Sequence, residues 1–295
     1  MEKINGTPYE NSRYFTRGDY TIHYRIDESH GERSGRVFLI HGFGCNTAFY
    51  DEITQNLCDN GIEVVRVDAP DFGWSSREHA GMSFIPREKV LRDLMDELYD
   101  GTGWILMGHS MGGSICIDIC NAGTDRIKAL ILICPMQTAK VPVIAKKAVM
   151  LRPVTKLMDL VMGPVSKADG AVKAMLFPTI LDMKYMRHFD GKRASACFGE
   201  PGTGTGLCVM TAVCVPPDME KAGKIPVPVL YIDADMDIFV TKKKREEFRK
   251  DLPDADKLTL RYGGHCMIQN RSPELMPEIL YFLIKNGLIE TTQVQ

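Results

Sequence analysis

Residues 104–122 read WILMGHSMGGSICIDICNA, and the rest of the chain can be interpreted outward from them. The apolar run 104–107 predicts a buried strand, and residues 113–122 have the apolar spacing of a helix. Between the two lies a Gly-x-Ser-x-Gly motif centred on Ser110. Glycine on both sides of the serine suits a turn that is too tight for larger side chains, and such a turn exposes the hydroxyl above a sheet. This context predicts that Ser110 is a nucleophile.

A serine hydroxyl is a weak nucleophile at neutral pH, so it needs a neighbouring base. The predicted strand 258–260 is followed by Arg-Tyr-Gly-Gly and then by His265. The two glycines favour a flexible turn, which would deliver the imidazole to the edge of the sheet where Ser110 lies. His265 is therefore the predicted general base.

A third group is expected to fix the tautomer of that base. The predicted strand 229–232 is followed directly by three carboxylates, those of Asp233, Asp235 and Asp237. They lie at the carboxyl end of their strand, as His265 does. Asp237 is the predicted orienting acid, and Asp235 is the alternative.

Short apolar runs alternate with amphipathic stretches along most of the chain, a pattern that predicts buried parallel strands connected by helices. One amphipathic stretch is 87–99, and another is 277–284, where Pro277 suits a first helical turn. Residues 20–26 alternate apolar and polar side chains, as an antiparallel edge strand does. The fold class is therefore α/β with a mostly parallel, doubly wound sheet. The predicted parallel strands are 37–40, 64–67, 105–107, 130–133, 229–232 and 258–260.

The alternation stops between residues 137 and 223, where no strand pattern is found. Residues 154–162 carry apolar side chains at helical spacing, and recurring prolines, at 142, 153 and 164, predict that the helices are short. We therefore expect a helical cap at 137–223, inserted between the two core segments 1–136 and 224–295.

Together these features resemble the α/β-hydrolase superfamily, and in particular its esterases and lipases that carry a helical cap. The resemblance rests on the order serine, aspartate, histidine, on the strand before each of them, and on His-Gly-Phe-Gly at 41–44. It covers nearly the whole chain. It implies the α/β-hydrolase fold and an oxyanion hole formed by the backbone N–H groups of Phe43 and Met111.

Four residues are predicted to line the substrate pocket, namely Gly42, His109, Met158 and Met162. The first two adjoin the oxyanion loop and the nucleophile, and the methionines belong to the cap. Because methionine adapts its shape to irregular ligands, a methionine-rich cap suits an apolar acyl chain. His109 is expected to pack beside Ser110 rather than to act as a second base, because the turn directs it away from the hydroxyl.

Composition excludes several classes of protein. A net charge of -2 supplies no basic field for nucleic acid. Nine cysteines lack metal-ligand spacing, and their odd number argues against a disulfide framework, so reduced thiols are expected. Residues 1–20 lack the apolar core of a signal peptide, and no apolar run is long enough to span a membrane. We expect a cytoplasmic protein whose chemistry requires no metal or organic cofactor.

The first half of the predicted cap is basic. Residues 137–173 contain seven Lys or Arg against two Asp, interleaved with Val, Leu and Met. This composition fits a weak contact with a lipid interface. The preferred interpretation is nevertheless a cover over the active site whose lysines face water.

The predicted activity is hydrolysis of small-molecule carboxylic esters with apolar acyl chains, as in esterases or monoacylglycerol lipases, through an acyl-enzyme. An amidase or aminopeptidase and a carbon-carbon bond hydrolase would use the same three residues. The basic cap counts against an aminopeptidase, which should present acidic side chains to the free amine of its substrate. A ligand receptor with a vestigial triad is the alternative from a different class of protein.

Overall fold

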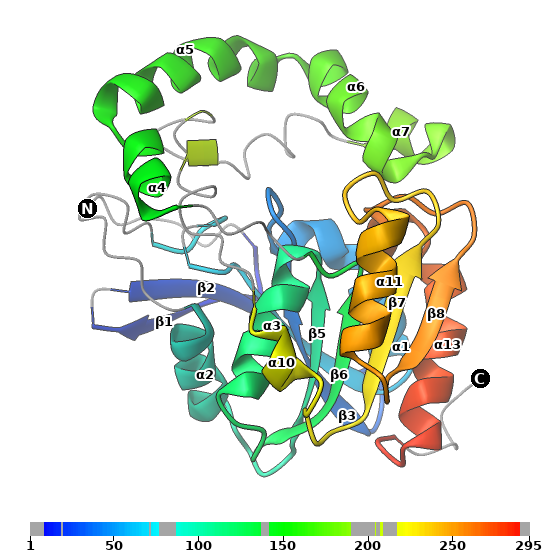
Figure 1. Cartoon of the computed structure of the whole chain (residues 1–295). Coiled ribbons are helices and arrows are strands. Elements are labelled where there is room, and N and C mark those ends of the chain that lie inside the picture. Colours follow the sequence, from blue (N-terminus) through cyan, green and yellow to red (C-terminus); the bar gives the residue numbers. More distant parts are fainter. Residues whose placement is uncertain are drawn as a thin grey trace.

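Eight strands form one sheet in the order β1-β2-β4-β3-β5-β6-β7-β8 (Figure 1). The computed structural model describes residues 9–18, 20–70, 72–76, 87–136, 142–189, 204, 207–208 and 217–289. The strands are β1 Ser12–Arg17, β2 Tyr20–Asp27, β3 Gly35–Ile40, β4 Ile62–Val67, β5 Trp104–His109, β6 Ile127–Ile133, β7 Val229–Ala234 and β8 Asp256–Leu260.

The sheet is antiparallel at one edge and parallel elsewhere. β2 pairs antiparallel with both β1 and β4, whereas all pairs from β4 to β8 are parallel. The six predicted parallel strands are confirmed, and so is the antiparallel strand at 20–26, but this strand is not the edge of the sheet because β1 lies outside it. The prediction missed β1, because most of its side chains are exposed and no buried alternation marks it in the sequence.

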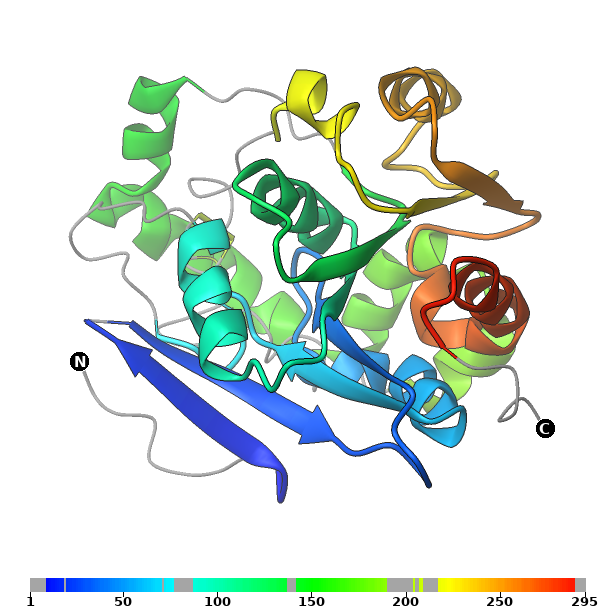
Figure 2. The same ribbon diagram turned by 90° about the horizontal axis from the view of Figure 1, so that it is seen from below.

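Helices cover both faces of the sheet, as Figure 2 shows from below. One layer contains α1 Asp51–Asp59, α12 Met267–Asn270 and α13 Ser272–Lys285, and the other contains α2 Arg87–Glu97, α3 Met111–Asn121, α10 Met219–Ala222 and α11 Lys242–Asp251. Alternate residues of β3 point to opposite layers, since Phe38 packs in one core and Leu39 in the other. Burial on both faces explains why the central strands contain continuous apolar runs, such as 37–40 in β3.

One helix boundary differs from the prediction. The last helix begins at Ser272, so Pro273 occupies its first turn, and Pro277 lies inside the helix. Pro277 lies about one turn further along the helix. Its missing N–H removes one hydrogen bond there, and the helix continues beyond it. The expectation that Pro277 begins this helix was therefore wrong.

Four helices between β6 and β7 lie above the carboxyl ends of the strands (Figure 1). They are α4 Val143–Val149, α5 Arg152–Lys167, α6 Asp169–Ile180 and α7 Met183–His188. The described part of this stretch contains no strand, as expected. Pro164, however, does not end a helix, because α5 continues through it to Lys167. A proline removes one hydrogen bond and crowds the carbonyl four residues before it, so it can bend a helix without ending it.

The described residues include only one of the two predicted limits of the cap 137–223. Gln137 and most of the glycine-rich segment 199–206 lie outside the described residues. At the other limit, Ala222 of α10 is buried in the core that also contains α3, and Asn121 Nδ2 donates to the Asp218 carbonyl oxygen at 3.0 Å. We therefore propose that the insertion ends before Asp218 rather than at Gly223.

The outer surface of α4 and α5 is apolar and basic. Six large apolar side chains are exposed there: Val143, Ile144, Leu151, Leu157, Leu160 and Val161. Exposed Lys147, Arg152 and Lys156 lie on the same two helices. Within the described ranges, no helix combines the length and the apolar character needed to cross a bilayer.

Candidate active site

Ser110 occupies a strained turn between β5 and α3. It has φ 54° and ψ -117°, which is an unusual conformation for a residue with a Cβ. Two flanking glycines make the turn possible. A Cβ on Gly108 would lie 2.5 Å from the Gly112 carbonyl oxygen, and one on Gly112 would lie 2.1 Å from the Ile40 carbonyl oxygen. The strand, the helix and the neighbouring strand β3 therefore approach too closely for any other residue.

The structure brings Ser110, His265 and Asp237 together. Nε2 of His265 lies 2.8 Å from the Ser110 hydroxyl, and Nδ1 lies 2.7 Å from the Asp237 carboxylate. A carboxylate accepts hydrogen bonds, so Nδ1 carries the ring proton and Nε2 accepts from the hydroxyl. This is the tautomer that a general base needs.

Of the two candidate acids, only Asp237 contacts the histidine. Its Oδ2 accepts from His265, and its Oδ1 accepts from the backbone N–H groups of Phe239 at 2.7 Å and Val240 at 2.8 Å. Burial alone would raise the pKa of Asp237, but these hydrogen bonds and the His265 ring lower it below its usual range. The carboxylate therefore stays ionised although it is buried, whereas Asp235 is exposed to solvent.

Two backbone donors are available where the oxyanion hole is predicted. In the described part of the chain, the N–H groups of Phe43 and Met111 have no hydrogen-bond partner. Met111 is the first residue of α3, and the N–H at this helix position has no partner within the helix, so it can bind an anion. Gly42 also adjoins the serine, because a Cβ there would lie 3.1 Å from the Ser110 Cβ. The N–H of Gly42, however, cannot serve the oxyanion hole, because it donates to the Tyr50 hydroxyl.

A chain of hydrogen bonds joins the oxyanion loop to the loop of His265. The N–H of Gly42 donates to the Tyr50 hydroxyl at 2.8 Å, which lies 2.9 Å from Nδ1 of His109, and Nε2 of His109 lies 2.8 Å from the His265 carbonyl oxygen. A backbone N–H only donates and a carbonyl only accepts. The direction is therefore fixed, with Tyr50 donating to Nδ1 and Nε2–H of His109 donating to the carbonyl.

His109 is thus placed as a fully bonded neighbour of Ser110, with both ring nitrogens directed to partners other than the hydroxyl. Tyr50 was not singled out from the sequence. Its hydroxyl joins Gly42 to His109, and His109 lies far from both in the chain. Met158 and Met162 lie half-buried on α5, and their assignment to the substrate pocket remains a prediction. His41 donates to the Gly42 carbonyl at 2.7 Å and accepts from the Ala69 N–H at 3.0 Å. Both of its ring nitrogens are therefore bonded to the backbone.

The burial of His109 predicts a pH-dependent contribution to stability. Burial, and then the neighbouring His265 ring, lower the pKa of His109 to about 3, whereas an unfolded histidine has a pKa of about 6.5. Below about pH 6.5 His109 binds a proton in the unfolded chain but stays neutral in the folded chain. The free energy of unfolding therefore falls as the pH drops toward about 3. One proton corresponds to about 1.4 kcal/mol per pH unit. Urea unfolding should show this slope in the parent protein and a smaller one in His109→Gln. Equal slopes would contradict the neutral buried state.

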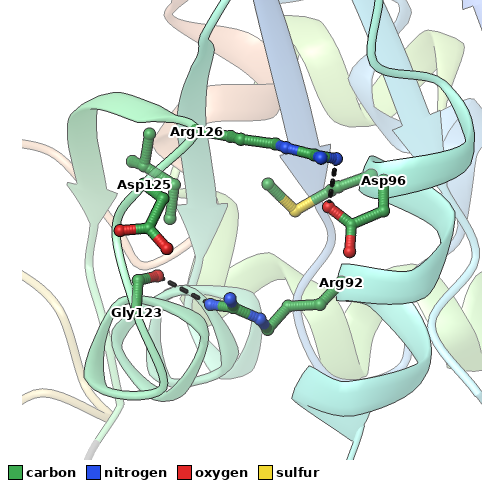
Figure 3. Close-up of a pocket in the computed structure, with 7 residues that line it drawn as sticks. Arg92, Asp96, Gly123, Asp125 and Arg126 are labelled. Atoms are coloured by element: carbon green, nitrogen blue, oxygen red, sulfur yellow. Dashed lines mark hydrogen bonds and ion pairs between the residues drawn. The ribbon is translucent and has the colours of Figure 1, made fainter.

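The described residues also line a small polar pocket at the opposite end of the sheet (Figure 3). It lies between the end of α2 and the loop before β6. Both of its arginines are already engaged, since Arg126 lies 2.6 Å from Asp96 and Arg92 donates to the Gly123 carbonyl at 2.6 Å. The pocket lies at the start of β6, whereas Ser110 follows the end of the parallel strand β5. The pocket is therefore separate from the candidate active site.

Comparisons with known proteins find similar hydrolases. A family model described as serine aminopeptidase, S33, matches residues 31–266. The monoglyceride lipase of Rattus norvegicus is 23% identical over 285 residues, covering 93% of this chain and 89% of that relative. A monoglyceride lipase homolog of monkeypox virus is 32% identical over 109 residues, which cover 35% of this chain and 39% of the viral protein.

Among solved structures, the enol-lactonase from Burkholderia xenovorans LB400 superimposes with a TM-score of 0.72 at 18% identity, covering 92% of this chain and 100% of that one. At this identity the likeness concerns the fold alone. The matched family model, in contrast, spans well over half of the chain. The chain is therefore an α/β-hydrolase and belongs to the serine aminopeptidase, S33, family.

Proposed function

We propose that this protein hydrolyses carboxylic esters with Ser110 as nucleophile, His265 as general base and Asp237 as the acid that orients the base. One observation carries the proposal, namely the directed hydrogen bonds from Ser110 to His265 and from His265 to an ionised carboxylate. The three groups are placed as nucleophilic catalysis by serine requires.

In the proposed cycle, the Ser110 oxygen attacks the ester carbonyl carbon while its proton moves to Nε2 of His265. The carbonyl oxygen becomes an oxyanion, which the N–H groups of Phe43 and Met111 stabilise. Protonated His265 then gives the proton to the departing alcohol as the carbon-oxygen bond breaks. Water, deprotonated by His265, releases the acyl group and restores the hydroxyl. Each proton is carried by His265 and returned within the cycle.

The proposed substrates are esters with apolar acyl chains, such as monoacylglycerols. The relationship to a monoglyceride lipase along 93% of this chain supports this class. The cap helices support it too, because Met158 and Met162 can adapt to a variable acyl chain. The description of the family includes aminopeptidases, so amides are the principal alternative to test.

Hydrolysis of p-nitrophenyl esters of increasing acyl length tests the proposal, together with labelling by a fluorophosphonate probe. We expect turnover that rises with acyl length before it falls, and one probe molecule bound at Ser110. Labelling without turnover on any ester would redirect the search to amides, to carbon-carbon substrates or to a receptor role. Absence of both would refute the proposed nucleophile.

We further propose that α4 and α5 contact lipid interfaces through their exposed apolar and basic side chains. Ile144 is 80% exposed, and exposed Lys147 and Lys156 lie on the same two helices. This combination favours anionic lipid surfaces. Monoacylglycerol hydrolysis should accelerate above the aggregation threshold of the substrate, and Ile144→Ser should reduce that acceleration without changing turnover of a short soluble ester. A smooth saturation curve through the threshold would refute interfacial binding.

A further inference from the structure

A thiol lies against the Asp237–His265 pair. Cys134 follows β6, Asp237 follows β7 and His265 follows β8, and these three strands are neighbours in the sheet. The Cys134 sulfur, a carboxylate oxygen of Asp237 and a ring nitrogen of His265 all lie within 4.8 Å of one another, and all three residues are buried. The cycle proposed above gives the thiol no role.

We propose that Cys134, Asp237 and His265 form a binding site for a thiophilic divalent cation such as Zn²⁺, and that occupation of this site switches the hydrolase off. Thiolate sulfur, imidazole nitrogen and carboxylate oxygen are the three ligand types that zinc prefers in proteins. Binding of the cation is independent of the proposed function, whereas its inhibitory effect rests on that function.

Charge balance favours a divalent cation at this buried position. A thiolate and a carboxylate carry two negative charges, a neutral imidazole carries none, and Zn²⁺ makes the cluster neutral. A neutral cluster avoids the large desolvation cost of an uncompensated buried charge. Without a cation the thiol keeps its proton, because burial, and then the negative charge of Asp237, raise the pKa of Cys134 well above its usual range.

The geometry is close to that of a zinc site. Zinc bonds of about 2.3 Å to sulfur and about 2.0–2.2 Å to nitrogen and oxygen place neighbouring ligand atoms about 3.3–3.7 Å apart. Nδ1 of His265 and Oδ2 of Asp237, now 2.7 Å apart, would have to separate to that spacing, and the Cys134 sulfur, which lies within 4.8 Å of a carboxylate oxygen and a ring nitrogen, would have to move by about 1 Å. Cys134 is held in place by its backbone, which has φ 43° and donates to the Ile232 carbonyl at 2.8 Å.

Binding would remove the base from the triad. The cation takes the lone pair of Nδ1 of His265, so the ring proton moves to Nε2, and the Cys134 thiol releases its proton to solvent. Nε2 then carries a hydrogen and no longer accepts the proton of Ser110. The Asp237 oxygen Oδ1 keeps its two backbone donors, because only Oδ2 turns to the metal.

Two readouts test this proposal, with Cys134→Ser as the main variant. Serine keeps the size of the side chain but binds zinc poorly. Titration of the full chain with Cd²⁺ should produce a sulfur-to-metal charge-transfer band in the ultraviolet, which is lost in Cys134→Ser and weakened in His265→Ala. The concentration of Zn²⁺ that halves ester turnover should rise at least tenfold in Cys134→Ser, about the smallest loss seen when a zinc ligand merely loses its hydrogen-bond partner.

Cys116→Ala is the matched control, because Cys116 is equally buried but lies in α3 among apolar side chains. This variant should keep both the band and the sensitivity to zinc. A parent protein without the band, or a Cys134→Ser variant as sensitive as the parent, would overturn the proposal. The band needs no turnover, so its presence in a protein that hydrolyses no ester would refute the proposed function and leave the metal site standing.

Discussion

Replacing Ser110 with alanine is expected to abolish ester turnover, with a loss of roughly 10⁵–10⁶-fold in kcat. The reason is that the variant lacks the atom that forms the acyl-enzyme, while the oxyanion donors and the substrate pocket remain. Those remaining groups account for a small residual rate above that of water. The variant should also lose labelling by the fluorophosphonate probe.

Ser114→Ala is the matched control for this loss. Ser114 lies one turn further along α3, is equally buried, and donates to the Met136 carbonyl rather than to His265. Its replacement removes a buried serine hydroxyl close to the site, so it reports any general damage to the helix. We expect Ser114→Ala to retain labelling and most turnover. If the two variants lost activity equally, the loss would reflect the integrity of α3, and Ser110 would not be identified as the nucleophile.

The sheet could be predicted from the sequence because its central strands are buried on both sides. Runs such as 37–40 in β3 and 129–133 in β6 are apolar throughout, and few other structures produce such runs between amphipathic helices. β1 could not be predicted in the same way, since an exposed edge strand is under little pressure to be apolar. The expectation that Pro164 ends a helix was wrong. The effect of a proline depends on its position within the helix, and the sequence does not show where that helix begins and ends.

The three proposed catalytic residues could be predicted because each lies just beyond the carboxyl end of a recognisable strand. Parallel strands carry their following residues to one edge of the sheet, so sequence order is enough to gather Ser110, Asp237 and His265. Tyr50 follows no strand, and Cys134, although it follows β6, belongs to no motif that would single it out. Tyr50 reaches His109 only through the packing of η1 (Thr47–Tyr50) against β5. The thiol of Cys134 becomes noteworthy only when its distance to the Asp237–His265 pair is known.

The choice between the two candidate acids leads to the second large effect. Asp237→Asn is expected to lower kcat by about 10⁴-fold, whereas Asp235→Asn should remain close to the parent. The two backbone N–H groups of Phe239 and Val240 donate to Oδ1, so the amide oxygen of the asparagine must take that position. Its NH₂ group then points at Nδ1 of His265, which must accept, and the ring proton moves to Nε2.

An Nε2 that carries a hydrogen cannot accept from Ser110, so the asparagine variant should fold normally and still lack its base. Thermal unfolding should therefore show little change, while ester turnover and fluorophosphonate labelling both slow strongly. Raising the pH should not restore the rate, because the defect is a wrong tautomer rather than a protonated acid. Because Asp235 is exposed and Asp237 is buried against the histidine, the opposite ranking of the two variants would mean that the acid used in turnover differs from the one in contact with His265.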